Sequence, residues 1–476
     1  MDEDGQGTDR RNANGTEDGL DEAKAAALGF MLARRQDGQV PPASAASLPA
    51  RAVGRRQRRP GFDSLPEYRQ IEAHKAAGKL LALDDPFYRA HQWAAGATAL
   101  IDGRGLVNFA SYDYLGLNDH PDAIAAAKAA LDTYAVSASA SRLVGGERTV
   151  HRELEQSIAA LYRVEDALAF VSGYLTNLAV IGCLTGLEDL VIHDEYIHNS
   201  VFAGIRLSGA TRRFFSHNDL DSLTGILDAA AGKFRRVLVV VEGLYSMDGD
   251  LPDLPGLIRL RERHGFWLMV DEAHALGVLG EEGRGSAEHF GCDPADVDIW
   301  MGTLSKTTSS CGGYIAGTRA LTDLLRANAG GFVYSVGMAP VLAAAALANL
   351  KTMRREPERR RRLKENARHF REQARQAGLD TGRSMGFAVV PVIVGDSVRA
   401  VKLSNDLFEG GVNVLPIIHP AVPEGMARLR FFITSEHTRE QMDMAVGMTA
   451  SLLRKLEAEN FGVGSLDIDT ISRLVG

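Results

Sequence analysis

A lysine in a loop of small hydroxylated residues follows an apolar run that ends on an acid. The lysine is Lys306, in the loop 302–310, and the acid is Asp271, directly after the run Trp267–Val270. This combination suggests pyridoxal phosphate (PLP) chemistry, in which the lysine amine forms a Schiff base with the cofactor and a carboxylate pairs with its pyridinium nitrogen. A lysine in such a loop is more often a plain surface residue. The hypothesis therefore depends on the motifs around the pair.

Further side chains could serve the same chemistry. His274, three residues after Asp271, and the hydroxyl of Ser246 could both reach the phenolic oxygen of the cofactor. His198 could lie over the pyridine ring, and Thr303 could offer its hydroxyl to the phosphate. Taken singly, each is more often an ordinary structural histidine or turn residue.

A candidate phosphate site follows the apolar run Ala167–Val171. Ser172, Gly173 and Tyr174 open a helical pattern there, and backbone N–H groups at a helix start bind anions. Tyr174 could pack beside the cofactor. A simple strand-to-helix turn with a core aromatic explains this motif alone equally well.

The elements that must position these residues alternate between helix and strand from about residue 118 to 330. Short buried apolar runs separated by helical segments predict a mostly parallel sheet with helices on both faces, which is an α/β architecture. Ligands bind at the carboxyl ends of such strands, where Asp271 stands. The expected strands include 167–171, 190–192, 237–241, 267–270 and 312–317.

The second half of the chain predicts a helical stretch over 340–378 and then short strands, such as 388–394 and 429–433, with helices between them. This pattern indicates a smaller α+β C-terminal domain. The expected division is a disordered or linker-like extension over 1–60 with a short helix at 21–36, an N-terminal segment at 61–117, a large cofactor-binding domain at 118–340 and a small domain at 341–476.

Composition excludes several classes of protein. A net charge of -8 over 476 residues argues against a nucleic-acid binder. The three cysteines form no CxxC motif, which argues against a disulfide framework or a metal site and favours the cytoplasm. No run approaches the length of a membrane span, and the acidic start differs from a secretory signal.

Several motifs together resemble those of the α-oxoamine synthases, a family of fold-type-I PLP enzymes. The family includes 8-amino-7-oxononanoate synthase, 2-amino-3-ketobutyrate CoA ligase, 5-aminolevulinate synthase and serine palmitoyltransferase. The resemblance extends from about Leu106 to Met448. Its motifs, in chain order, are 108–117, 141–146, 172–174, 198–200, 242–250, 271–274, 302–306 and 427–430.

The resemblance implies a role for each matching residue. Lys306, His198, Asp271 and His274 would be catalytic, with Lys306 forming the Schiff base and moving the proton. Arg430 would bind the amino-acid carboxylate; Arg428 lies on the same face of its strand, so the choice between them comes from the family match. The implied cofactor contacts are Ser172, Gly173, Tyr174, His198, Ser246, Asp271, His274, Thr303 and Lys306.

The chain also departs from the family. Tyr112 stands where members often have an asparagine that helps to hold the substrate, and we predict that Tyr112 contacts the substrate here, beside Ser139 and Ser141. The Ser/Thr-rich run that reaches the partner subunit's phosphate in many members is replaced by residues 334–337. These changes suggest a divergent branch.

The expected reaction is a decarboxylative condensation of glycine, alanine or serine with an acyl thioester, carried by CoA or a carrier protein, to an α-amino ketone. Members of the family are homodimers, so we expect a homodimer. The alternatives are a fold-type-I aminotransferase or aldolase and, in another class, a non-catalytic partner subunit; an intact Lys306 argues against the last.

Overall fold

The computed structural model describes residues 59–463. The predicted extension, except its last two residues, and the helix expected at 21–36 lie outside the described residues. The chain divides into two units, 1–65 and 66–476. The described residues of the first unit form one short 3-10 helix, η1 (Phe62–Ser64).

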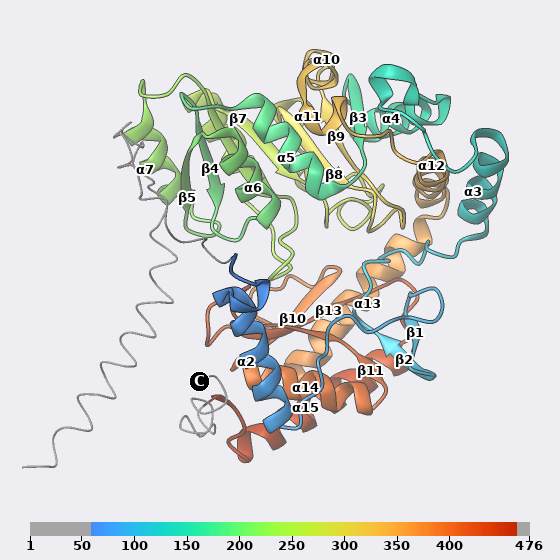
Figure 1. Cartoon of the computed structure of the whole chain (residues 1–476), viewed down its shortest axis with the longest axis vertical. Coiled ribbons are helices and arrows are strands. Elements are labelled where there is room, and N and C mark those ends of the chain that lie inside the picture. Colours follow the sequence, from blue (N-terminus) through green and yellow to red (C-terminus); the bar gives the residue numbers. More distant parts are fainter. Residues whose placement is uncertain (1–58, 464–476) are drawn as a thin grey trace, which may run out of the picture. The chain divides into compact units, whose positions relative to one another are not determined.

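The middle of the chain forms a seven-stranded sheet (Figure 1). Its strand order is β3-β9-β8-β7-β6-β4-β5, and β9 alone runs antiparallel to its neighbours. The mostly parallel sheet predicted from the buried runs is therefore confirmed. The strands are β3 (Asp166–Phe170), β4 (Leu190–Asp194), β5 (Thr211–Phe215), β6 (Val237–Glu242), β7 (Trp267–Asp271), β8 (Ile299–Thr303) and β9 (Gly313–Gly317).

Helices cover both faces of this sheet. Successive strand residues point to opposite sides, so each strand packs apolar side chains against the helices of both faces. Val239 and Val241 of β6 belong to one apolar cluster, while Leu238 and Val240 belong to another. The first cluster includes residues of α4 (Thr149–Tyr162), α7 (Leu220–Ala230), α8 (Leu254–His264) and α12 (Pro340–Arg355). The second includes residues of α5 (Gly173–Leu184), α6 (Asn199–Ser208), α10 (Arg319–Asn328) and α11 (Gly330–Val333).

Two three-stranded sheets lie outside the large one. The first joins β1 (Thr98–Ile101) and β2 (Arg104–Asn108) to β11 (Val412–Asn413), so an early segment pairs with a late one. The second contains β10 (Val389–Gly395), β13 (Ala427–Phe432) and β12 (Leu415–Ile417). The helices of this region are α13 (Pro357–Gln376), α14 (Ser397–Glu409) and α15 (Arg439–Ala458). The boundaries expected at residues 117 and 340 stay a prediction.

The remaining described helices belong to none of the groups above. They are α2 (Pro66–Leu80), α3 (Pro121–Tyr134), the π-helical turn η2 (Arg142–Gly146), α9 (Ser286–Phe290) and η3 (Pro294–Asp296). Within residues 59–463, no helix is both long and apolar enough to cross a membrane. The same residues hold no cluster of His, Cys, Asp and Glu that could bind a metal ion.

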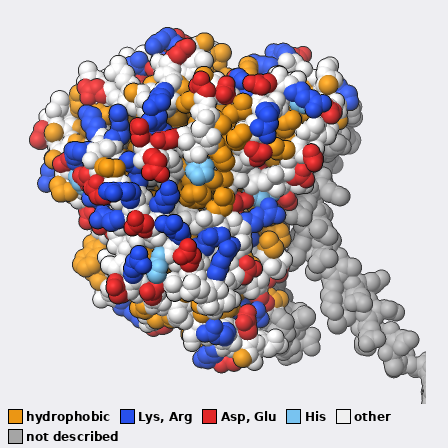
Figure 2. All heavy atoms as spheres, turned by 180° about the vertical axis from the view of Figure 1, so that it is seen from behind, with side chains coloured by type: hydrophobic (Ala, Val, Ile, Leu, Met, Phe, Trp, Pro, Cys, Tyr) orange, Lys and Arg blue, Asp and Glu red, His pale blue; other side chains and the backbone are white. Residues whose placement is uncertain are grey.

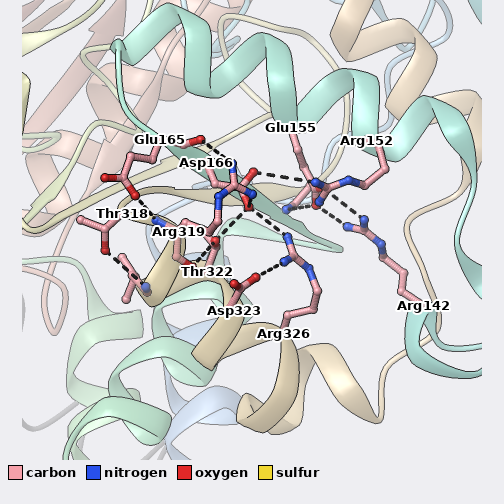
Figure 3. A network of polar contacts seen from close by, with 12 residues as sticks. Arg142, Arg152, Glu155, Glu165, Asp166, Thr318, Arg319, Thr322, Asp323 and Arg326 are labelled. Atoms are coloured by element: carbon pink, nitrogen blue, oxygen red, sulfur yellow. Dashed lines mark hydrogen bonds and ion pairs between the residues drawn. The ribbon is translucent and has the colours of Figure 1, made fainter.

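A polar network ties η2 to the large sheet (Figure 3). Arg142 of η2 pairs with the fully buried Glu155 of α4, which also accepts a hydrogen bond from the Ala169 N–H of β3 at 2.9 Å. Asp166, the first residue of β3, pairs with Arg326 of α10 at 3.3 Å. The charged groups therefore fix η2, α4 and α10 against one strand.

Candidate active site

The candidate site begins at the carboxyl ends of adjacent parallel strands. Strands β4, β6, β7 and β8 end on Asp194, Glu242, Asp271 and Thr303, and the register places Glu242 directly beside Asp271. Polar side chains at this edge follow the rule for ligand sites in α/β sheets. Burial beside Asp271 raises the pKa of the Glu242 carboxyl to about 8.

Asp271 is buried and held from both oxygens. Its Oδ1 accepts from the Ala273 N–H at 3.0 Å, and its Oδ2 accepts from the side-chain amide of Asn177 at 3.1 Å. Asn177 lies one turn into α5, which follows the candidate phosphate motif. No sequence motif assigns a role to Asn177; its position one helical turn after Gly173 is the signal that could have marked it.

Lys306 follows β8 by three residues. Its Nζ lies 5.5 Å from the centroid of the Tyr112 ring and makes no hydrogen bond or ion pair within the described residues. Burial lowers the pKa of the Lys306 amine to about 8, and the charge of Arg430 acts in the same direction, while Asp271 and Glu242 oppose it. A lysine of lowered pKa has a free amine available near neutral pH, as carbonyl chemistry requires.

His198 connects to Asp271 through two side chains. The Ser200 hydroxyl donates to His198 Nδ1 at 2.7 Å and accepts from the Asn177 amide at 2.8 Å. Because the same amide also donates to Asp271, one chain of hydrogen bonds fixes the imidazole and the carboxylate together. Desolvation and the charge of Lys306 lower the pKa of His198, and Asp271 opposes them.

His274 is buried, and its Nδ1 lies 2.6 Å from the hydroxyl oxygen of Tyr114. Its ring stacks on that of Phe432, with centroids 6.4 Å apart and 17° between the planes. Burial and the charges of Lys306 and Arg430 keep the pKa of His274 well below its ordinary value. The imidazole is therefore neutral at pH 7.

The start of α5 offers two backbone N–H groups. Ser172 caps the helix by accepting from the Leu175 N–H at 3.1 Å, while the N–H groups of Gly173 and Tyr174 have no partner within residues 59–463. The Thr303 hydroxyl stands beside them, since a Cβ on Gly173 would lie 2.9 Å from its Oγ1. Free N–H groups and a hydroxyl at a helix start suit a phosphate.

Arg428 and Arg430 both contact the turn 246–248 that follows β6, but their partners differ. Arg428 is buried and ion-paired with Asp248. The Nη1 of Arg430 donates to the Ser246 carbonyl at 3.0 Å, its Nε has no partner, and no carboxylate pairs with it among the described residues. Ser246 itself is buried, and its N–H donates to Glu242 at 3.0 Å.

Tyr112 forms a wall beside Lys306. Its ring lies edge-on to Phe432 at 4.6 Å and to His274 at 5.9 Å between centroids. Tyr174 lies at the outer side, edge-on to His198 at 6.3 Å. The structure thus brings together the predicted residues except the pair Ser139 and Ser141, which lie before η2 and make no hydrogen bond to the others in the described part.

The chain is similar to known proteins in both sequence and structure. The pattern of the family described as aminotransferase class I and II matches residues 104–448. The 8-amino-7-oxononanoate synthase of Symbiobacterium thermophilum is 43% identical over 358 residues, which cover 75% of this chain and 91% of that protein. That of Pseudomonas putida strain KT2440 is 41% identical over 362 residues, covering 76% and 92%. The serine palmitoyltransferase of Sphingomonas wittichii superimposes with a TM-score of 0.79 at 31% identity, covering 83% of this chain and 99% of that chain.

Proposed function

The chain belongs to the aminotransferase class I and II family, and on that premise we propose that it is a PLP-dependent α-oxoamine synthase. It joins a small α-amino acid to an acyl thioester and releases CO2, leaving an α-amino ketone. The observation that carries this proposal is the unpaired Lys306 amine, with its pKa lowered to about 8, beside Asp271 and the free Nε edge of Arg430.

The residues of the site fit PLP. Two free N–H groups at the start of α5 and the Thr303 hydroxyl suit its phosphate, and Asp271 suits its ring nitrogen. Lys306 would hold the cofactor covalently, His198 would cover its ring, and Tyr174 would flank it. His274 and Ser246 would lie at its phenolic oxygen. When bound, PLP supplies an electron sink that stabilises negative charge at the amino-acid α-carbon.

The protein's own groups would orient the amino acid and move its proton. Arg430 binds the carboxylate through its guanidinium, because a planar cation matches a planar anion. Lys306, displaced from the cofactor by the amine of the amino acid, would remove the proton from the α-carbon and hold it on Nζ. Asp271, fixed by Asn177, would keep the ring nitrogen of bound PLP protonated. The rings of Tyr112 and Phe432 line the lysine side of the site.

The bonds balance with one proton taken up from solvent, because the amino acid supplies one α-proton and two protons are consumed. A carbon–carbon bond forms between the amino-acid α-carbon and the thioester carbonyl carbon, and the carbon–sulfur bond breaks. The thiol leaves with one proton, the α-carboxylate leaves as CO2, and a proton takes its place. The name of one relative, serine palmitoyltransferase, indicates serine as its amino acid and a palmitoyl group as its acyl group. For this chain glycine, alanine and serine are the candidate amino acids, and CoA or a carrier protein is the candidate donor.

We further propose that the chain acts as a homodimer in the cytoplasm. Exposed apolar side chains lie around η2 and after α11, and their burial by a second copy would stabilise such a dimer. They are Val136, Leu143, Val144, Tyr334 and Val336. The cysteines Cys183, Cys292 and Cys311 are free. Figure 2 shows positive and negative side chains intermingled on one face of the molecule, which does not favour nucleic acid as a partner.

An absorbance titration tests the function. Purified protein loaded with PLP is mixed in turn with glycine, L-alanine and L-serine, then with acyl-CoA or an acyl-carrier protein. A spectral change with one amino acid, followed by thiol release on adding the thioester, is the expected result. Conversion of a keto acid without any thioester would contradict the proposal and favour the alternative of a fold-type-I aminotransferase. Failure to take up PLP would favour the alternative of a non-catalytic partner subunit.

A further inference from the structure

The segment Tyr112–Tyr114 contacts the site from the N-terminal strands. It follows β2, which pairs with β11 rather than with the large sheet, yet each of its residues touches a different part of the candidate site. We infer that Tyr114 is a positioning residue, which fixes the imidazole of His274 in the tautomer that carries its proton on Nε2.

The geometry defines the direction of this hydrogen bond. Tyr114 OH and His274 Nδ1 are 2.6 Å apart, and the two residues are 0% and 6% exposed. Burial raises the pKa of the Tyr114 phenol well above its ordinary value, so it keeps its proton. The His274 imidazole is neutral because its pKa is lowered. The phenol therefore donates to Nδ1, and the ring proton stays on Nε2.

The other ring nitrogen of His274 has no partner among the described side chains. His274 Nε2 has no hydrogen-bond partner within residues 59–463. The atom is not completely enclosed by the protein. The N–H group is thus presented to the site that also holds Lys306 and Arg430, whose charges act on the same ring. An N–H donor suits an anionic oxygen, such as the phenolic oxygen of PLP; this step depends on the proposed function.

Asp113 holds the segment in place. Its Oδ1 accepts from the Leu117 N–H and from the Ser309 hydroxyl, both at 2.7 Å. Ser309 in turn donates its N–H to the Lys306 carbonyl at 2.8 Å. One short segment therefore fixes both the lysine loop and the histidine, so the Tyr114 hydroxyl stays in line with Nδ1.

The test compares Tyr114→Phe with Tyr162→Phe. Tyr162 is a matched control because its hydroxyl is also buried and bonded to one side chain, Tyr314 OH at 2.8 Å, and it has no contact with His274. Nitrogen NMR of protein with isotope-labelled histidine, assigned with His274→Ala, reports which ring nitrogen carries the proton. We expect Nε2 to be protonated in the wild type and in Tyr162→Phe, with the proton moving or exchanging in Tyr114→Phe. An unchanged His274 signal in Tyr114→Phe overturns the inference.

A second measurement separates positioning from simple loss of folding. PLP affinity is measured for the wild type, Tyr114→Phe, His274→Ala and the double variant. Loss of one buried hydrogen bond predicts about two- to tenfold weaker PLP binding by Tyr114→Phe, and no further loss when His274 is already absent. Equal losses in both backgrounds contradict the inference. If no form binds PLP, the proposed function fails, while the NMR result still decides the role of Tyr114.

Discussion

Arg428 and Arg430 lie two positions apart on β13, and alternation along the strand puts both on one face. Their surroundings separate them. Arg428 is committed to the buried ion pair with Asp248. Arg430 has the Phe432 ring 4.8 Å from its guanidinium carbon and an unpartnered Nε. The family match selected Arg430, but alternation along the strand gives no reason for the choice, because the difference depends on the turn 246–248, which follows a strand of another sheet.

Replacing Arg430 by lysine tests this distinction. Lysine keeps the charge but loses the planar pair of donors, so we expect KM for the amino acid to rise about ten- to hundredfold. Arg428→Lys is the matched control and should lower the melting temperature while leaving KM near its wild-type value, since it weakens a structural ion pair. Steady-state kinetics and thermal unfolding measure the two effects. A rise in KM with Arg428→Lys as large as with Arg430→Lys would contradict the assignment.

The pH dependence of Lys306 follows from its environment. A free amine is needed to attack the PLP aldehyde, and burial lowers the pKa of Lys306 to about 8. The rate of PLP uptake by protein stripped of cofactor should therefore rise with pH and level off above about pH 8. Tyr112 adds a cation–π contact that favours the ammonium form. Tyr112→Leu should lower the midpoint by less than about one pH unit, whereas Tyr112→Phe keeps the ring and the midpoint. Equal shifts in both variants would show that the ring contact is not the cause.

At this scale the sequence predicted the residues that carry distinctive motifs but not their supports. Lys306, Asp271 and His274 stand in recognisable loops at the ends of apolar runs. Asn177 and Tyr114 hold two of them through single hydrogen bonds from other elements. Nothing local in the sequence marks such a pairing, because it depends on how α5 and the segment after β2 pack.

Among the elements, most buried strands were predicted, including the edge strand β3, but the buried strand β8 and the edge strand β5 were not. The runs of Val, Leu and Ile in β6 and β7 indicate strands covered on both faces. β5 was missed because it is an edge strand whose Arg212 and Arg213 are exposed. The helical stretch expected over 340–378 is two helices, α12 and α13. Pro357 is the first residue of α13 and ends the preceding helix at Arg355.

From the network around Glu155 we expect this carboxylate to stabilise η2. Glu155 accepts from Arg142, from Arg152 and from the Ala169 N–H while fully buried. Glu155→Gln leaves a buried guanidinium without its full counter-charge, so we expect the free energy of unfolding to fall by about 3 kcal/mol. Asp323→Asn, which alters the exposed pair with Arg326, should cost less than about 1 kcal/mol. Urea unfolding of both variants measures the difference, and similar losses would refute a central role for Glu155.

For the whole molecule, long-range pairing is what the sequence could not give. β2 pairs with β11 across about 300 residues, and Phe109, just after β2, packs against Phe370 and Phe431. Periodicity within a window cannot reveal such contacts. This pairing matters for the site, since it carries Tyr112, Asp113 and Tyr114 to the lysine loop and to His274.

The most direct test of the proposed chemistry counts products. Protein loaded with PLP is supplied with one amino acid and one acyl thioester, and free thiol and CO2 are measured together, with Lys306→Ala as the control. The α-oxoamine synthase proposal predicts thiol and CO2 in equal amounts, only when both substrates are present, and neither from Lys306→Ala. Thiol release without CO2, or equal activity in Lys306→Ala, would contradict it.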